Sequence, residues 1–286
     1  MSDLRINNIT DRTGDSGPVI AGVSTVSSTG AFTVPVGPTE MRGGRGRAVV
    51  VLGATPSVVN TMDYFETATA GNAIDFGNAS VARYQNGFGG MASGTRGVFQ
   101  GGASPSSNIM EYVTISSSGG AADFGDHHRG ITNGNGQCAN GTRGLLAGGY
   151  LAPTPYNTID FITIATTGST SDYGEIDDGS TGGYSPMASS TRAVFARGEQ
   201  NLNYINFTSG GKTQIFGDMR GDSRTGHIAS CSNSTRGIMA GGEAPSRVNT
   251  ITFITIATLG NPTDFGDLTQ ARSQPSSCSD VHGGLG

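Results

Sequence analysis

The sequence lacks several features on which common classes of protein depend. It has no Trp, only three Cys, and a single Lys (Lys212) among 17 basic residues, with a net charge of −5. No Lys/Arg-rich stripe of the kind that binds nucleic acid is present. No run approaches the ~20 apolar residues that a membrane-spanning helix needs, and the first residues lack the apolar stretch of a signal peptide. We therefore expect a protein made in a cytoplasm, with no nucleic acid partner and no membrane insertion.

Motifs for catalysis and metal binding are also missing. The sequence has no G-x-S-x-G nucleophile motif, no phosphate-binding loop and no CxxC pair. One local pair, His127–His128 beside Asp126, consists of residue types that bind metals. Adjacent residues on a strand point to opposite faces, so both histidines could bind one ion only from a loop. We predict that the protein is not an enzyme and has no cofactor and no metal site.

Glycine and small polar residues are abundant instead. Gly contributes 47 of the 286 residues, whereas hydrophobic residues make up 35% and charged residues 14%. Short β-branched runs with period-two alternation, such as residues 158–164 and 250–256, lie between turn residues. No capped stretch of good helix formers is present. This composition predicts an all-β protein.

Three sequence marks recur five times in the same order, at intervals of about 47 residues. The first mark is an Arg before an apolar strand, which is often followed by Gly-Gly: Arg47, Arg96, Arg143, Arg192 and Arg236. The second is an Asn followed four residues later by an aromatic: Asn60/Tyr64, Asn108/Tyr112, Asn157/Phe161, Asn203/Phe207 and Asn249/Phe253. The third is an aromatic-Gly pair: Phe76-Gly77, Phe124-Gly125, Tyr173-Gly174, Phe216-Gly217 and Phe265-Gly266. Repeats of this length with β-branched strands are typical of propeller blades that pack face to face around an axis.

The order of these marks resembles the kelch repeat of β-propellers, over residues 47 to 286. In that family a Gly-Gly doublet ends the second strand of each blade, an alternating third strand follows, and an aromatic lies near the fourth strand. Kelch blades usually carry Trp at the last aromatic position, where this sequence has Phe or Tyr. The resemblance implies an all-β, five-bladed, kelch-like β-propeller over residues 42–286, its ring closed by a C-terminal strand around Gln274–Asp280.

The first 41 residues are expected to form a separate, short β-rich arm. Residues 6–18, 22–25 and 32–35 resemble the opening module of virion proteins from contractile-tailed phages, especially those that infect cyanobacteria. The repeat segments 157–168 and 264–269 are similar to structural proteins of the same phages. The resemblance implies a virion protein of the tail or an attached appendage. It also implies that residues 1–41 anchor the chain to other virion proteins and that the protein is a homo-oligomer or is present in several copies.

The repeated arginines and the cysteines are expected to be structural. Each Arg should bond a carboxylate or carbonyl in its own or the adjacent blade. The repeat set is Arg96, Arg143, Arg192 and Arg236, and the carboxylates that follow the third mark are its natural partners: Asp126, Glu175, Asp218 and Asp267. Cys138 and Cys231 stand where other copies have Met91 and Met187, which predicts that these side chains pack along the inner strands.

Loops that differ between blades are the candidate binding site. In a kelch register, the loops after Gly-Gly and the loops before each first strand share one face of the disc, and binding specificity is usually placed in such variable loops. The candidate residues are Tyr150, Tyr156, His127, His128, Arg129, Asp177, Asp178, Tyr184, Arg220, Arg224 and Arg247. A mixture of Tyr, Asp and Arg suits a polar target such as a surface sugar. The alternative is that these residues form only exposed turns.

Three functional hypotheses follow. The first is a non-enzymatic phage virion protein whose propeller binds a glycan or protein receptor on the host surface. The second is a purely architectural protein that decorates the tail, neck or capsid and makes only protein contacts. The third, an enzyme that degrades host polysaccharide, is the weakest because the sequence ties no catalytic set together.

Overall fold

The computed structural model describes residues 47–66, 70–83, 90–102, 107–131, 135–151, 153–177, 184–196, 201–219, 228–244, 246–273 and 277. The chain divides into two units, Met1–Gly44 and Arg45–Gly286, and every described residue belongs to the second. The predicted N-terminal arm, residues 1–41, therefore lies outside the described residues. In the part of the chain that is described, no helix is long and apolar enough to span a bilayer.

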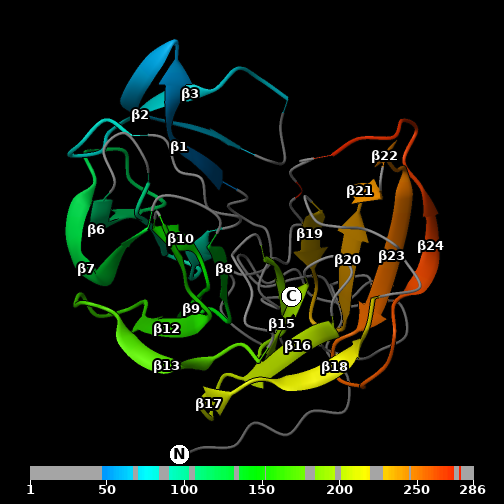
Figure 1. The fold of residues 1–286 in the computed structure, drawn as a ribbon. Helices are drawn as coiled ribbons and strands as arrows, with labels where there is room; N and C mark the ends of the chain where they lie inside the picture. Colours follow the sequence, from blue (N-terminus) through cyan, green and yellow to red (C-terminus); the bar gives the residue numbers. More distant parts are fainter. Residues whose placement is uncertain are drawn as a thin grey trace, which may run out of the picture. The chain divides into compact units, whose positions relative to one another are not determined.

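The described residues form five small antiparallel sheets arranged as a five-bladed β-propeller, which confirms the predicted all-β fold (Figure 1). Blade 1 contains β1 (Arg47–Thr55), β2 (Ser57–Glu66) and β3 (Ile74–Asn78). Blade 2 contains β4 (Met91–Ala92), β5 (Arg96–Gln100), β6 (Ser107–Thr114) and β7 (Ala122–Ile131). Blade 3 contains β8 (Gly136–Ala139), β9 (Arg143–Ala147), β12 (Thr158–Thr163) and β13 (Ser171–Glu175).

The last two blades repeat this order. Blade 4 contains β14 (Ser185–Ala188), β15 (Arg192–Ala196), β16 (Asn201–Asn206) and β18 (Gln214–Asp218). Blade 5 contains β19 (Ala229–Ser232), β20 (Arg236–Ala240), β23 (Thr250–Thr255) and β24 (Thr263–Asp267). Short hairpins follow two of the second strands: β10 (Tyr150–Leu151) with β11 (Thr154–Pro155), and β21 (Glu243–Ala244) with β22 (Ser246–Arg247). The short strand β17 (Gly211–Lys212) leaves blade 4 and pairs with β13 of blade 3.

The hydrophobic core lies between consecutive blades rather than inside any one of them. One buried cluster joins Leu145 and Ile159 of blade 3 to Phe195 of blade 4. Equivalent clusters join blades 1 and 2, blades 2 and 3, and blades 4 and 5. A single four-stranded sheet cannot bury both of its faces, so each blade depends on its neighbours for stability.

Soft side chains on the first strands fill the space between blades, as the sequence predicts. Met91 lies against Gly144 of the next blade, where an added Cβ would come 2.6 Å from the Met91 sulfur. Met187 has the same relation to Gly237, again at 2.6 Å. Cys138 belongs to the cluster between blades 3 and 4, and burial raises the pKa of its thiol to about 12. This cysteine is therefore a packing residue with an unreactive thiol.

The predicted closing strand of blade 1 lies almost entirely outside the described residues. Described blade 1 has three strands, β1 to β3, and Ser277 is the sole described residue of the segment 274–280. A cavity of ≈ 360 Å³ lies beside β1, and Val49, Gly97 and Ile115 are among its lining residues. Gly97 is the blade 2 equivalent of Gly144 and Gly237, which in later blades receive a first-strand methionine. This position suits a C-terminal first strand, which stays a prediction.

The repeated arginine begins the second strand of blades 2 to 5 and the first described strand of blade 1, and in blades 1 to 4 it joins that blade to the next. Its guanidinium lies over the aromatic ring of the third strand, as for Arg96 over Tyr112 at 4.2 Å and Arg192 over Tyr204 at 4.4 Å. Each of these two arginines also donates a 2.9 Å hydrogen bond to a backbone carbonyl of the following blade. Arg47 and Arg143 make the corresponding bond, and Arg236 lies over its blade's aromatic ring. The predicted carbonyl acceptor is therefore confirmed for four of the arginines, and Arg47 also pairs at 2.8 Å with a carboxylate of its own blade, Glu66, which is not one of the four proposed carboxylates.

The second mark was misassigned in blade 4. The aromatic under Arg192 is Tyr204 rather than the predicted Phe207, because β16 pairs Leu202 with Gly217 and so aligns Tyr204 with the ring of the other blades. Phe207 lies beyond the end of β16, and its carbonyl instead accepts the hydrogen bond from Arg143. The Asn in the predicted pair, Asn203, is buried within the strand.

Replacing Arg192 with methionine should lower the free energy of unfolding by about 2–3 kcal/mol. The variant keeps most of the apolar stem but loses a charged hydrogen bond and a cation–π contact. Urea denaturation followed by fluorescence or circular dichroism measures this change. Arg247→Met is the matched control, because Arg247 is exposed on β22, and this variant should change stability by less than about 0.5 kcal/mol. Equal effects of the two substitutions would contradict the structural role of the repeat arginine.

Candidate functional site

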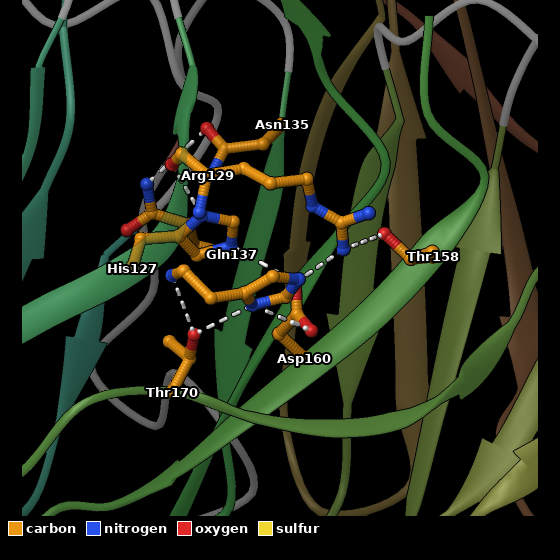
Figure 2. Close-up of polar contacts among 8 residues, drawn as sticks. His127, Arg129, Asn135, Gln137, Thr158, Asp160 and Thr170 are labelled. Atoms are coloured by element: carbon orange, nitrogen blue, oxygen red, sulfur yellow. Dashed lines mark hydrogen bonds and ion pairs between the residues drawn. The ribbon is translucent and has the colours of Figure 1, made fainter.

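A polar cluster that contains two histidines lies at the junction of blades 2 and 3, and no other junction of the described residues has such a histidine pair (Figure 2). It consists of His127, His128 and Arg129 at the end of β7 together with Asp160 on β12, and we call these four residues the His–Asp cluster. Thr158, Thr170, Asn135 and Gln137 surround it. The side chains therefore come from both blades and meet where the blades pack.

A bulge in β7 brings the adjacent histidines together. Ile109 pairs with Asp126, but Ser107, two residues earlier on β6, pairs with Ile131, five residues later on β7. The extra residues leave the regular ladder, so side chains in this segment need not alternate between faces. The His127 and His128 rings are accordingly stacked, with centroids 5.0 Å apart and an interplanar angle of 20°. The sequence-based objection to a shared site assumed a regular strand, and the bulge removes it.

His127 occupies a position that is apolar in every other blade. It is the second residue after the aromatic-Gly pair, where the other four blades have Ala79, Ile176, Met219 and Leu268. The His127 side chain is only 1% exposed. A buried imidazole in place of an aliphatic side chain carries a desolvation cost that packing alone does not require. The internal repeat thus marks His127 as a residue with a function other than packing.

Asp160 is the centre of the cluster and is itself 2% exposed at its side chain. Its Oδ2 lies 2.9 Å from His127 Nε2 and 3.1 Å from Arg129 Nη2, which donates a hydrogen bond to it. Its Oδ1 lies 3.3 Å from His128 Nδ1. Arg129 also donates to the Thr158 hydroxyl, and its guanidinium lies 4.7 Å from the centre of the Tyr156 ring.

Contacts of the ring nitrogens assign the tautomer of His127. Its Nδ1 lies 2.7 Å from the carbonyl oxygen of Arg129 and 3.2 Å from the Arg129 backbone nitrogen; the shorter contact is to an acceptor, so we assign the hydrogen to Nδ1. The Nε2 of the neutral ring then has a lone pair, and this lone pair faces the Asp160 carboxylate. The Nε2 lone pair and Asp160 Oδ2 are both hydrogen-bond acceptors, and at 2.9 Å they repel each other unless a proton or a cation lies between them.

Buried polar atoms without a hydrogen bond are concentrated at this junction. Among the described residues, six buried side-chain atoms make no hydrogen bond, and five of them belong to the cluster or its neighbours. The five are His127 Nε2, Asp160 Oδ1, Arg129 Nε, Asn135 Nδ2 and Gln137 Oε1. Such atoms are rare in folded proteins because each loses its bonds to water without replacement. Their concentration makes the junction of blades 2 and 3 the candidate functional site among the described residues.

Burial is the main influence on the ionisation of His128. Loss of solvent lowers the pKa of this residue, the Asp160 carboxylate opposes this effect, and the Arg129 charge acts in the same direction as burial. The unfolded chain therefore binds the proton more readily than the native protein. Through this group, stability falls as the pH drops below the ordinary His pKa of about 6.5. Above that pH His128 is neutral, and its lone pair is available.

The structure brings together five of the residues predicted for the variable-loop face. Strand β10, which contains Tyr150, lies against β7, and the Arg129 guanidinium lies 4.7 Å from the centre of the Tyr156 ring. Tyr150 and Tyr156 are half-buried. Of the three cluster residues on β7, His128 and Arg129 are partly exposed, whereas His127 is buried.

The other predicted residues are placed elsewhere. Tyr184 is wrong as a surface binding residue, because it is fully buried between blades 3 and 4, edge-on to Phe195 and against Gly148. Asp177 forms an ion pair with Lys212, which raises the pKa of that lysine through their hydrogen bond. Arg247 is exposed on the hairpin β21–β22. Asp178, Arg220 and Arg224 lie outside the described residues.

Sequence reasoning missed Asp160 and the four surrounding polar residues. Asp160 is the one charged residue in the apolar strand Thr158–Thr163. The equivalent positions of blades 2, 4 and 5 hold Glu111, Asn203 and Thr252, all buried and polar. A polar residue at the middle of every later third strand was therefore a visible signal, although the sequence did not indicate its partner.

Comparison with known proteins does not assign the chain to a family. No protein-family model matches the sequence, and no curated protein matches it to a significant degree.

Proposed function

We propose that the chain is a non-enzymatic structural protein of a phage virion, in the tail or an attached appendage. Residues 1–41 anchor it to other virion proteins, and the propeller binds a glycan or protein on the host surface. The binding surface is the patch formed by Tyr150, Tyr156 and the two partly exposed members of the His–Asp cluster, His128 and Arg129. The virion placement rests on the sequence resemblance of the N-terminal segment and of the repeats.

The observation that carries the binding proposal is a difference between two kinds of polar contact: those that recur in successive blades and those found between blades 2 and 3. Most described polar contacts recur from blade to blade, as the repeat arginines do. The patch between blades 2 and 3 does not recur, and it combines two half-buried tyrosines with histidine and arginine side chains. Tyrosine rings stack on the apolar faces of sugars while their hydroxyl groups and the cations form hydrogen bonds, so this chemistry suits a polar, hydroxylated target.

A multi-copy virion protein can act through weak individual sites. Simultaneous binding of several propellers raises overall avidity by about 10² to 10⁴-fold over a single site. A patch of this size need therefore provide only modest affinity in each copy.

Direct binding to cells tests the proposal. Fluorescently labelled full-length protein should bind saturably to one of a panel of cyanobacterial strains and compete with phage adsorption. Tyr156→Ala and Tyr150→Ala should each weaken binding by about 10-fold or more, as expected for central aromatic contacts. Asp264→Ala, an exposed change on β24 in blade 5, is the matched control and should bind like the original protein.

The other outcomes distinguish the competing hypotheses. Absence of cell binding, together with loss of the protein from virions when residues 1–41 are deleted, would establish the architectural role instead. Release of short sugars from purified host polysaccharide would replace the binding proposal with an enzymatic one.

A further inference from the structure

Three ligand atoms converge at the junction of blades 2 and 3. His127, His128 and Asp160 each offer one such atom, and these atoms all lie within 4.8 Å of one another. His127 Nε2 lies 2.9 Å from Asp160 Oδ2, and His128 Nδ1 lies 3.3 Å from Asp160 Oδ1, so each imidazole faces a different oxygen of the same carboxylate. Both separations are close to those between ligands of a tetrahedral zinc ion. Bonds of about 2.0–2.1 Å at the tetrahedral angle place neighbouring ligand atoms about 3.3 Å apart.

The tautomer of His127 is the one that a metal requires. Its Nδ1–H donates to the carbonyl oxygen of Arg129 at 2.7 Å, as ligating histidines usually donate their second nitrogen to a carbonyl or carboxylate. This bond directs the Nε2 lone pair toward Asp160. A cation bound to both His127 Nε2 and Asp160 Oδ2 would attract each of these acceptors and so remove the repulsion between them.

The surrounding residues hold the other two ligands in place. Arg129 donates to Oδ2 of Asp160, while Oδ1 makes no hydrogen bond with any residue the structure describes. The Thr170 hydroxyl lies 3.1 Å from both the backbone nitrogen and Nδ1 of His128; it positions the ring, and its contact with Nδ1 must be released when Nδ1 binds an ion. His128 is 41% exposed at its side chain, so an ion can reach the site from solvent and retain water as a further ligand.

We propose that His127, His128 and Asp160 bind one divalent transition-metal ion, with Zn²⁺ the best match to two imidazoles and a carboxylate. The ion links β7 of blade 2 to β12 of blade 3. The Arg129 guanidinium opposes the positive charge of the ion, so we expect micromolar affinity rather than the much tighter binding of closed structural zinc sites. This inference does not depend on host binding, because the ion would bind in the purified protein.

Calorimetric titration of the metal-free, full-length protein with ZnCl₂ tests the site. The protein should carry no polyhistidine tag. We expect one equivalent of Zn²⁺ to bind, a rise in Tm of about 5 °C at saturating ion, and a visible Co²⁺ spectrum typical of tetrahedral coordination. Ca²⁺, which prefers six to eight oxygen ligands, should produce none of these changes.

Two ligand variants should lose this binding by at least about 100-fold, which exceeds the effect of removing a group outside the coordination sphere. His128→Ala changes a half-exposed side chain and should leave the fold intact. His127→Leu introduces the residue that blade 5 has at this position and should keep or increase stability without metal. Asp126→Asn and the double variant His227→Ala/His282→Ala are matched controls, and both should bind Zn²⁺ like the original protein.

Two results would overturn the metal site. One is the absence of saturable Zn²⁺ binding to the original protein, and the other is unchanged affinity in His128→Ala. In either case the cluster would be a buried network of hydrogen bonds and ion pairs that joins blades 2 and 3 without a metal.

Discussion

Replacing Arg83 with methionine is expected to lower the free energy of unfolding by about 3–5 kcal/mol, because it leaves a buried carboxylate without its cation. Arg83 lies just after β3 and is fully buried. Its Nη2 lies 2.7 Å from Glu111 Oε2, and its Nε donates to the carbonyl oxygen of Gly101 at 2.8 Å. The partner carboxylate is also buried and accepts a 2.7 Å hydrogen bond from the Ser80 backbone. Urea denaturation at neutral pH measures the change.

A double-variant cycle separates the ion pair from simple packing. Glu111→Met should be destabilising by itself, whereas the combination Arg83→Met/Glu111→Met should recover much of the loss, because no unpaired charge is then buried. A loss below about 1 kcal/mol in Arg83→Met would contradict the pairing. Additive effects in the double variant would show that the two side chains act independently.

The Arg83–Glu111 pair also explains how the His–Asp cluster fits the scaffold. Glu111 and Asp160 occupy the same position on the third strands of blades 2 and 3, and each meets a cation from the end of the preceding blade. Between blades 1 and 2 one arginine satisfies the carboxylate. Between blades 2 and 3 the cations come from a bulged strand, and Asp160 retains an oxygen without a hydrogen bond. The candidate site therefore contains the same carboxylate–arginine ion pair as the junction of blades 1 and 2, with two histidines added to it.

The fold could be predicted from the sequence because the chain repeats itself. A sequence mark that recurs in five copies indicates a residue with the same structural role in successive blades, so the five copies together support one assignment of the fold. The repeat Arg marks the start of the second strand. Met91 and Cys138 occupy equivalent positions on the first strands of their blades, and both side chains pack against the following blade.

The site could be predicted only in part, for the same reason. His127 and His128 stood out because they break the repeat, but their partner Asp160 is 32 residues or more away along the chain, in a different blade. The bulge that aligns the two rings depends on the pairing of β6 with β7, which alternation in a single strand does not reveal. Tyr184 was misplaced because a tyrosine near a turn can point inward, and here the space above Gly148 receives its ring.

Gly77→Ala is expected to lower the free energy of unfolding by about 3 kcal/mol or more, since it combines backbone strain with a clash between blades. Gly77 belongs to the aromatic-Gly pair of blade 1 and has a φ of 141°. An added Cβ would lie 2.2 Å from the carbonyl oxygen of Gly119 in blade 2. That contact cannot relax easily, because the Gly119 backbone nitrogen donates a 2.6 Å hydrogen bond to the carbonyl oxygen of Phe76.

Two other glycines separate the causes of this loss. Gly266, the blade 5 equivalent, has the same φ of 141° but no atom within 4 Å of an added Cβ, so Gly266→Ala should lose only the ~1–2 kcal/mol of left-handed backbone strain. Gly119 contributes the other half of the contact, and an added Cβ there also meets nothing within 4 Å, so Gly119→Ala should be nearly neutral. Thermal or urea unfolding of the three variants should therefore rank them Gly77, Gly266, Gly119 in decreasing loss. Equal losses of stability in Gly77→Ala and Gly266→Ala would mean that the close approach of blades 1 and 2 is not a reason why position 77 requires glycine. The predicted order instead makes this glycine a requirement of blade packing, which explains the aromatic-Gly pair of blades 1 to 4, where an added Cβ would clash with the next blade.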